Sequence, residues 1–172
     1  VVYNYQQKIW YYGNLARTVW LDRGIQANPV AAGTDHYLYE HENGLDDGST
    51  EPASAIAAHI ESSQVDLGDG NQFSFVNRII PDIAFRNSTA ASPSATITLK
   101  ARNYPGGAYL QTDADAVTQT TSGTSTVIEQ FTNQVNLRLR GRSLALRVAS
   151  TDTGVTWRLG SPRIDLKPDG RR

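Results

Sequence analysis

The stretch VNLRLRGRSLALRVAS, residues 135–150, decides the fold class of this chain. Apolar and polar residues alternate from Val135 to Leu139, and the alternation resumes after Gly141. A period of two over this length predicts long antiparallel strands that are buried on one face only. The solvent-facing side chains of these strands would be Asn136, Arg138, Arg140 and Arg147. No catalytic constellation lies on or near the two strands, which favours an all-β structural or binding protein.

The composition limits the classes to which the chain can belong. Its 172 residues are enough to bury a core, as one large unit or two small ones. With 16 Lys and Arg against 17 Asp and Glu, the charge does not indicate a general binder of nucleic acid or anionic membranes. The longest apolar runs are too short to cross a bilayer, so we expect no membrane insertion. The absence of cysteine excludes a disulfide framework and a thiolate metal site.

The chain contains no methionine, although a natural intracellular chain starts with one. It opens with VVYNYQQ, which already has the composition of a strand. We therefore expect a C-terminal piece of something longer, or a processed product.

Residues 1–44 are dense in aromatic side chains, which favour the pleated surface of a sheet. Residues 1–13 predict a strand, a short turn and a second strand, and further strands are expected at residues 15–22 and 36–42. The turn before the last strand is expected at residues 33–35. Three or four short strands with turns at roughly ten-residue spacing predict one meandering sheet of the size of a propeller blade.

The acidic segment LDDGSTEP, residues 45–52, is the best candidate for a linker. Beyond it, about seven or eight alternating segments and no convincing helix suit a β-sandwich of jelly-roll type. The expected organisation is a propeller-blade-like β-meander at residues 1–44, the linker, and a β-sandwich domain at residues 53–172.

Several segments of the second domain carry finer predictions. Residues 55–68 would form a strand with one face made by Ile56, Ala58 and Ile60. Residues 72–85 would form a long strand whose inward side chains are Phe73, Phe75 and Ile79. Pro81 would require an edge position or a bulge, because proline cannot donate to the ladder. We expect a turn at residues 104–109 and a long mobile connection at residues 112–125.

The histidines and acidic residues do not gather into a metal-binding motif. His36 and His41 would face opposite sides of one strand, because an odd number of positions separates them, and His59 lies beyond the linker. The segment DLGDGN, residues 66–71, has oxygen donors near glycine but lacks the order of a calcium loop. An Asx turn between strands explains it better. We therefore expect no metal ion and no other cofactor.

Motifs of catalysis are also missing from the sequence. There is no G-x-S-x-G nucleophile elbow, and YPGGAY lacks the lysine and the helix of a phosphate-binding loop. Carboxylates are numerous, but their spacing alone does not assign a glycosidase pair. We therefore expect that the protein is not an enzyme.

The one local cluster of charge consists of Arg138, Arg140, Arg142 and Arg147, joined by Arg158, Arg163, Arg171 and Arg172. One interpretation is a basic strip that faces DNA in a channel or an acidic neighbouring subunit. The other is a solvated strand face whose arginines suppress edge pairing. Because the same strands carry no matching acids, we favour an interface formed by Arg138, Arg140 and Arg147.

The tyrosines and tryptophans near the amino end also allow two interpretations. They could form a sugar-stacking platform, as in a lectin, with a groove lined by Tyr3, Trp10 or Tyr37. Packing within a small sheet, which has little else to bury, is the simpler explanation.

Four segments together resemble a known family. They are KIWYYGNLARTVWLDRG, DHYLYEHENGLDDG, HIESSQVDLGDGNQFSFVNRIIPD and RLRGRSLALRVASTDTGVTWRLGSPRIDLKPDGRR. Their order and spacing resemble the C-terminal region of virion structural proteins from tailed phages. The particular class is the tail nozzle (tail tubular protein B) and packaged-DNA-stabilisation proteins of podoviruses. The resemblance covers most of the chain, and its last segment is the most specific part.

This resemblance implies a fold, partners and a location. Nozzle proteins of this kind are similar to a β-propeller joined to β-rich platform domains, assembled as a sixfold homo-oligomeric ring. The ring would continue the DNA channel, pass DNA without sequence specificity, and dock adaptor and fibre or spike proteins. The expected location is the virion, after assembly in the host cytoplasm. Residues 1–44 would be a closing blade, which cannot bury both its faces alone.

The sequence thus predicts a virion structural protein of a short phage tail that turns over no substrate. One alternative is a carbohydrate-binding β-sandwich module, which requires the aromatic groove. The other is a tail-associated polysaccharide-degrading enzyme, which requires two carboxylates about 5 to 10 Å apart across one cleft.

Overall fold

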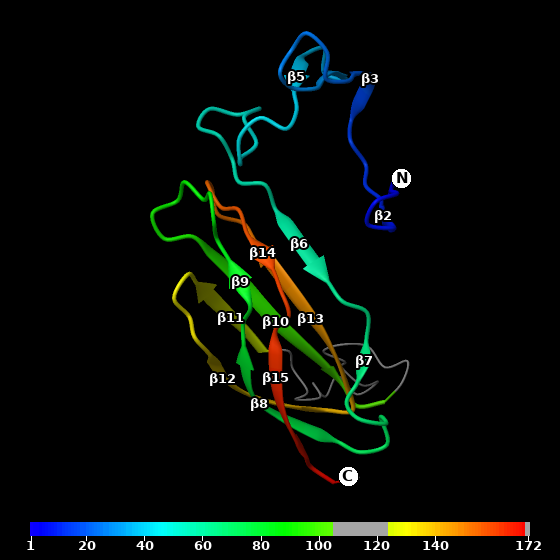
Figure 1. The fold of residues 1–172 in the computed structure, drawn as a ribbon, viewed down its shortest axis with the longest axis vertical. Helices are drawn as coiled ribbons and strands as arrows, with labels where there is room; N and C mark the ends of the chain where they lie inside the picture. Colours follow the sequence, from blue (N-terminus) through cyan, green and yellow to red (C-terminus); the bar gives the residue numbers. More distant parts are fainter. Residues whose placement is uncertain (105–123, 171–172) are drawn as a thin grey trace, which may run out of the picture. The chain divides into compact units, whose positions relative to one another are not determined.

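The computed structural model describes residues 1–104 and 124–170 (Figure 1). Within these residues no helix is present and every strand pair is antiparallel. The prediction of an all-β fold is therefore confirmed. The chain divides into two compact units, unit 1 (Val1–Gly44) and unit 2 (Leu45–Arg172). The turn expected at residues 104–109 and the connection expected at residues 112–125 lie outside the described residues, apart from their outermost positions.

Unit 1 contains five short strands in two separate sheets. They are β1 (Val2–Asn4), β2 (Ile9–Tyr11), β3 (Arg17–Leu21), β4 (Val30–Gly33) and β5 (Leu38–Glu40). β1 and β2 form a hairpin, and β3, β4 and β5 form a three-stranded sheet. The single meandering sheet expected from the sequence is therefore wrong. The sequence did not reveal β4, because VAAG follows a proline and is mostly small residues without a strand signature.

The turn between β4 and β5 is closed by Asp35, as the sequence predicted for residues 33–35. Its carboxylate accepts hydrogen bonds from the backbone N–H of Tyr37 at 3.3 Å and from the hydroxyl of Tyr39. The backbone N–H of Gly33 donates to the carbonyl of Tyr37 at 2.8 Å. A Cβ at Gly33 would lie 2.7 Å from the ring of Tyr39, so a larger residue there would displace the side chains that close this turn.

Unit 2 is built from two larger sheets and a short strand pair (Figure 1). The five-stranded sheet has the order β11-β10-β13-β6, with β7 also paired to β13. Its strands are β6 (Ala58–Glu61), β7 (Val65–Asp66), β10 (Ser94–Arg102), β11 (Thr124–Glu129) and β13 (Ser143–Ser150). The three-stranded sheet has the order β12-β8-β15, with bounds Val135–Gly141, Ser74–Ile80 and Arg163–Pro168. The short pair joins β9 (Ile83–Ala84) to β14 (Arg158–Leu159).

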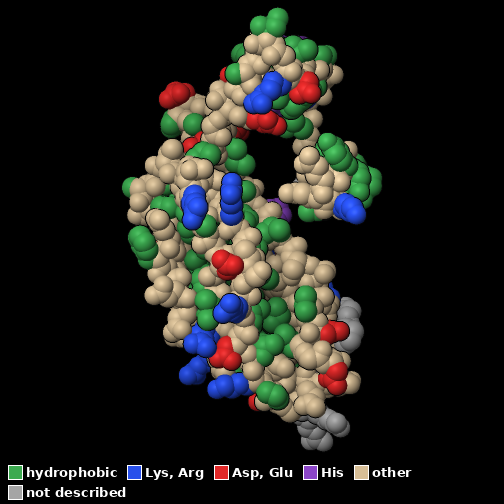
Figure 2. All heavy atoms as spheres, in the orientation of Figure 1, with side chains coloured by type: hydrophobic (Ala, Val, Ile, Leu, Met, Phe, Trp, Pro, Cys, Tyr) green, Lys and Arg blue, Asp and Glu red, His purple; other side chains and the backbone are tan. Residues whose placement is uncertain are grey.

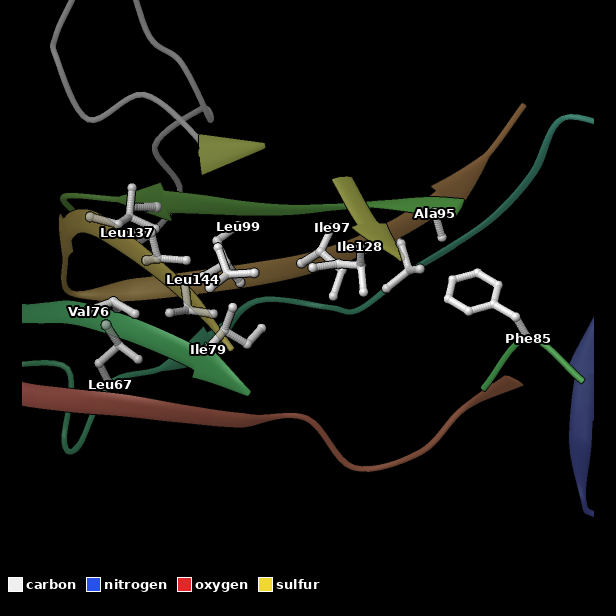
Figure 3. Packing of buried hydrophobic residues seen from close by; sticks show 14 residues of the cluster. Leu67, Val76, Ile79, Phe85, Ala95, Ile97, Leu99, Ile128, Leu137 and Leu144 are labelled. Atoms are coloured by element: carbon white, nitrogen blue, oxygen red, sulfur yellow. The ribbon is translucent and has the colours of Figure 1, made fainter. Parts of the chain in front are cut away.

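The two larger sheets pack face to face across one apolar core (Figure 3). β10 alternates between buried and partly exposed residues, and its inward side chains are Ala95, Ile97, Leu99 and Ala101. The opposite sheet contributes Val76, Ile79, Leu137 and Leu139. Removal of these side chains from water is the main source of stability for a sandwich of this kind.

A β-bulge changes the inward set predicted for residues 72–85. The register between β8 and β12 shifts, so Val76 and Ile79 both reach the core although they are three positions apart. Phe73 and Ile79 are buried, as predicted. Val76 takes the inward position that the sequence assigned to Phe75, which is only partly buried.

Two further segments differ from a regular strand pattern. Ile56 and Ile60 are each 52 % exposed, and β6 lies at the edge of its sheet. Pro81 lies in the break between β8 and β9, so it is neither on an edge strand nor in a bulge. Because proline has no N–H to donate, it instead ends the central strand of the three-stranded sheet.

The acidic segment at residues 45–52, expected as a linker, begins unit 2. The carboxylate of Asp46 accepts a hydrogen bond from the backbone N–H of Gly154 at 2.7 Å. Asp47 and Ser54 exchange two backbone hydrogen bonds, at 2.8 and 3.0 Å. The bond from Gly154 attaches the segment to the rest of unit 2, and the Asp47–Ser54 pair closes the segment on itself.

Two valines allow a matched test of the core. Val76 of β8 is 0 % exposed, whereas Val127 of β11 is 56 % exposed. We expect Val76→Ala to lower the free energy of unfolding by about 2 kcal/mol, because it removes buried methyl groups and leaves a cavity. The same change at Val127 should cost less than about 1 kcal/mol. Chemical denaturation followed by circular dichroism measures both losses, and equal losses would contradict this core.

Candidate functional site

β12 and β13 are separated by one residue, Arg142, yet they belong to different sheets. The chain turns a corner there and passes from the three-stranded sheet to the five-stranded sheet. A Cβ at Gly141 would lie 2.8 Å from the Cβ of Ala101 and 3.1 Å from the backbone oxygen of Arg102, so the corner requires glycine. The backbone N–H of Arg142 donates to that same oxygen at 2.8 Å, which fixes the corner against β10.

This corner divides the predicted arginine cluster between two surfaces. Arg138 and Arg140 lie on the outer face of the three-stranded sheet, because the leucines that alternate with them point into the core. Arg147 lies on the outer face of the five-stranded sheet, opposite Thr98 of β10. The outer faces of two stacked sheets point in opposite directions. The three arginines expected at one interface therefore do not form one strip.

Arg140 is held by contacts within the chain. Its Cζ lies 3.9 Å from the centroid of the Phe73 ring, and its guanidinium forms an ion pair with Asp169. The Nη2 atom also donates to the backbone oxygen of Asp169 at 3.3 Å. The backbone N–H of Asp169 in turn donates to the carbonyl of Phe73 at 2.8 Å. Arg140 therefore fastens the segment that follows β15 to the sheet.

Arg147 also has a partner within unit 2. Its Nη1 lies 3.5 Å from the carboxylate of Glu61, and the Nζ of Lys100 lies 2.7 Å from the same carboxylate. The hydrogen bond from Lys100, together with the positive charges of Lys100 and Arg147, holds the pKa of Glu61 below its ordinary value of 4.5. The matching acid that the sequence did not show on these strands comes from β6.

The remaining arginines of the predicted cluster are dispersed. Arg142 places its Cζ 4.7 Å from the ring centroid of Phe73 and donates to the backbone oxygen of Asn71 at 3.2 Å. Arg158 lies on β14 and Arg163 lies on β15. Two members of the cluster lie outside the described residues, Arg171 and Arg172.

The outer face of the three-stranded sheet nevertheless collects basic side chains from all its strands. We call it the basic face, and it consists of Arg78, Arg138, Arg140, Arg163 and Lys167. In Figure 2, blue side chains gather at the lower left of the sandwich, where β12, β8 and β15 lie in Figure 1. This concentration of positive charge is the strongest candidate for a functional surface in unit 2.

The register of β15 places its charges on this face. Ile164 packs against the core, so Arg163 and Asp165 on either side of it point outward. Asp165 lies opposite Arg78 on β8, and the two side chains form an ion pair with 3.6 Å between nitrogen and oxygen. Lys167 is exposed beyond the register shift that follows Asp165.

Sequence reasoning missed Arg78 and Lys167 as members of this surface. Arg78 is surrounded by apolar residues in FVNRII, which indicates a buried strand rather than a charged face. For Lys167 a signal was present, because RIDLK alternates charged and apolar residues with a period of two. That alternation places the charges at positions 163, 165 and 167 on one side of a strand.

The three histidines are dispersed as well. The Nε2 of His41 accepts a hydrogen bond from the Nε of Arg17 at 3.0 Å, and its ring lies 4.7 Å from that of Trp20. His36 lies in the turn before β5, and His59 lies on β6 in unit 2. Among residues 1–104 and 124–170, no three His, Asp or Glu side chains gather in a way that could hold a metal ion.

Residues 66–71 form the predicted Asx turn. The backbone N–H of Asn71 donates to the Oδ1 of Asp69 at 3.0 Å, and the side-chain amide of Asn71 donates to the Oδ2 at 3.2 Å. Gly68 and Gly70 adopt φ values of 71° and 73°, which side chains rarely tolerate. The carboxylate of Asp69 is therefore used within the turn.

Most of the described aromatic side chains of unit 1 are exposed instead of packed in a core, and Tyr39 is partly buried. Tyr3 and Trp10 lie opposite each other in the β1–β2 hairpin, with ring centroids 4.6 Å apart, and they remain 46 % and 68 % exposed. The interpretation that these residues pack inside a small sheet is therefore wrong. Tyr37 lies just before β5, which belongs to the other sheet of unit 1, so it is not part of this hairpin.

A hollow of about 430 Å³ lies beside the loop between β3 and β4. It is lined by Leu21, Asp22, Gly24, Ile25, Gln26, Asn28 and Val30. Neither the predicted aromatic groove nor a pair of carboxylates is found there, because Asp22 is the single acid among these residues and none of them is aromatic.

Comparisons with known proteins do not assign this chain to a family. No family model matches the chain, and no curated protein matches it significantly. The part of the chain that the structure describes contains no helix long and apolar enough to span a membrane.

Arg140 and Arg138 form a matched pair on the same face of the same strand. We expect Arg140→Gln to lower the free energy of unfolding by about 1 kcal/mol, because it removes the contact with Phe73 and the partly screened ion pair with Asp169. Arg138→Gln should change it by less than about 0.5 kcal/mol, since this exposed side chain has no ion pair with any described residue. Urea denaturation of both variants tests whether Arg140 stabilises the fold. A larger loss in the free energy of unfolding for Arg138→Gln than for Arg140→Gln would contradict this role.

Glu61 gives a prediction about pH. Because the pKa of Glu61 is lowered in the folded chain, its stabilising effect is present at neutral pH and is lost as the pH falls below 4.5 through the folded pKa. We therefore expect Glu61→Gln to be less stable than the wild type at pH 7, and the difference to shrink in acid. Chemical denaturation at a series of pH values measures this difference in the free energy of unfolding. Glu129→Gln, at an exposed carboxylate with no ion pair in the described part of the chain, is the control, and a difference independent of pH would contradict the assignment.

Proposed function

We propose that this chain is a structural protein of a short phage tail, of the nozzle or tail-tube kind. In this proposal, copies of the chain form a ring that continues the DNA channel and docks adaptor and fibre proteins. The ring is sixfold, and the protein acts in the virion without turning over a substrate. The work of the protein is mechanical, so it depends on surfaces that contact other subunits.

The observation that carries the proposal is the lack of a core in unit 1. Among its residues with described side chains, only Pro29, Ala31 and Gly33 are buried. Large apolar side chains are exposed in both of its sheets, and Trp10, Val19 and Leu38 are 68 %, 64 % and 76 % exposed. A unit of this size with so much exposed apolar surface is typical of a part that is completed by a partner.

One face of the three-stranded sheet of unit 1 is especially suited to such a contact. The register pairs Val19 with Ala32 and Ala32 with Leu38, so these residues share one face. Leu21 lies on the same face, two positions after Val19, and is 65 % exposed. An apolar sheet face is the surface that stacked sheets bury against each other.

Unit 2 supports the proposal in a different way. Its core is closed, with Val76, Leu99 and Ile128 fully buried, so the sandwich does not depend on a partner for its own packing. The segments that resemble nozzle proteins extend over both units. A self-contained sandwich joined to an incomplete unit agrees with a platform domain attached to part of a larger β-assembly.

The oligomeric mass of the purified chain, measured by light scattering across a salt series, tests the proposal. We expect a ring-sized species whose formation is prevented by Val19→Ser combined with Leu38→Ser, because both changes make the apolar face polar. Ile60→Ser, at a similarly exposed isoleucine on β6 of unit 2, is the matched control and should leave the mass unchanged.

A monomer at every salt and protein concentration would contradict the proposal. In that case the exposed Tyr3–Trp10 pair makes carbohydrate binding the next candidate, because stacked exposed aromatics suit sugar rings. A glycan array probed with the wild type and with Trp10→Ala would then decide between a binding module and an inert fragment.

A further inference from the structure

The basic face contains more positive charge than its own carboxylates neutralise. Two of its five cations are paired, Arg78 with Asp165 and Arg140 with Asp169. The other three, Arg138, Arg163 and Lys167, are exposed and form no ion pair with any residue of the described part of the chain. The chain as a whole has a net charge of −1, so this excess is local.

We propose that the basic face binds the phosphate backbone of DNA through Arg138, Arg163 and Lys167. The inference deepens the proposed function by naming the surface that would contact DNA, and it rests on that function only for its biological setting. The contact itself follows from the charges on the sheet and does not require a ring.

The spacing of the three free cations suits a polyanion. Arg163 and Lys167 are four positions apart on β15, which corresponds to about 13 Å along a strand. Arg138 lies on β12, at the opposite edge of the sheet and two strand spacings away, or about 10 Å. Exposed cations at such separations can each meet a different phosphate of one duplex, since DNA carries a charge about every 1.7 Å along its axis.

The composition of the face favours a phosphate backbone over an acidic protein. Protein interfaces have an apolar centre from which charged residues are depleted, whereas DNA-binding surfaces are polar and strongly positive. Here the central strand β8 places the Arg78–Asp165 ion pair on the face, between the partly buried Phe75 and the exposed Ile80. Two of the three free cations are arginines, whose planar guanidinium can bind a phosphate through two hydrogen bonds.

Contacts of this kind carry no information about base sequence. Phosphate contacts position a protein on DNA, and specificity requires side chains that reach base edges in a groove. The free cations stand on the surface of a sheet and not on a protruding element, so we expect binding that does not depend on sequence. Its affinity should fall steeply with salt, because each phosphate contact releases counterions.

Fluorescence anisotropy with a labelled DNA duplex of arbitrary sequence, measured across a salt series, tests the proposal on the wild-type chain. Three phosphate contacts predict a slope of about −2.7 in a plot of log K against log salt, which is roughly a 40-fold loss of affinity between 50 and 200 mM. A second duplex of unrelated sequence should bind equally well. Absence of binding at low salt would overturn the proposal.

Substitutions locate the contact. Arg138→Gln and Arg163→Gln should each reduce the magnitude of the slope by about 0.9, and Arg138→Lys should retain it, because the charge is kept. Arg147→Gln is the matched control, since it removes the same charge from the opposite sheet and should leave the slope unchanged. Equal effects of Arg138→Gln and Arg147→Gln would overturn the proposal, because binding would then follow the net charge alone. Circular dichroism confirms that each variant is folded.

Competition separates the two classes of polyanion. We expect inorganic polyphosphate to displace the DNA at a lower concentration than poly-L-glutamate of equal charge. The reverse order would overturn the proposal in favour of an acidic protein partner. The oligomeric mass is measured separately, so the two proposals can fail independently. DNA binding by a monomer would refute the proposed ring and leave this inference standing. A ring that does not bind DNA would refute this inference and leave the proposed ring standing.

Discussion

The architecture of unit 2 depends on the corner between β12 and β13. Antiparallel strands that follow each other in the chain often pair in a hairpin, which needs a loop of two or more residues, but only Arg142 separates β12 from β13. Here the absence of a side chain at Gly141 lets the backbone pack against Ala101 and Arg102 of β10, so the chain crosses from one sheet to the other. Both alternating runs then direct their apolar side chains into one core from opposite sides, and their arginines are sent to opposite surfaces.

The distribution of charge follows from this separation. On the five-stranded sheet Glu61 meets both Arg147 and Lys100, which balances much of the charge there. On the three-stranded sheet the acids of β15 and its following segment pair with Arg78 and Arg140, and three cations have no carboxylate partner among the residues that the structure describes. An arginine-rich sequence therefore divides into residues that hold the fold together and residues that face solvent. Sequence proximity does not distinguish these two roles, because the partners come from distant strands.

Periodicity in the sequence predicted the features that depend on local alternation. The strands around Leu99, Leu139 and Val148, the all-β class and the Asx turn at Asp69 each follow from patterns within a few residues. The features that could not be predicted depend on pairing between distant segments. The bulge that places Val76 instead of Phe75 in the core arises from the register between β8 and β12. The position of Arg147 depends on the corner that carries the chain from one sheet to the other.

The two units make opposite use of their apolar residues. In unit 2 the alternating strands bury one face against a second sheet, and scattered apolar side chains such as Ile60 and Val127 remain exposed among charged and polar ones. In unit 1 the register is equally regular, and Ala32 joins Val19 to Leu38 across three strands, but no second sheet within that unit covers this face. Hydrogen bonds between paired strands alone contribute little net free energy, because the same backbone groups form hydrogen bonds with water in the unfolded chain. Packing within its own residues therefore contributes little to the stability of unit 1.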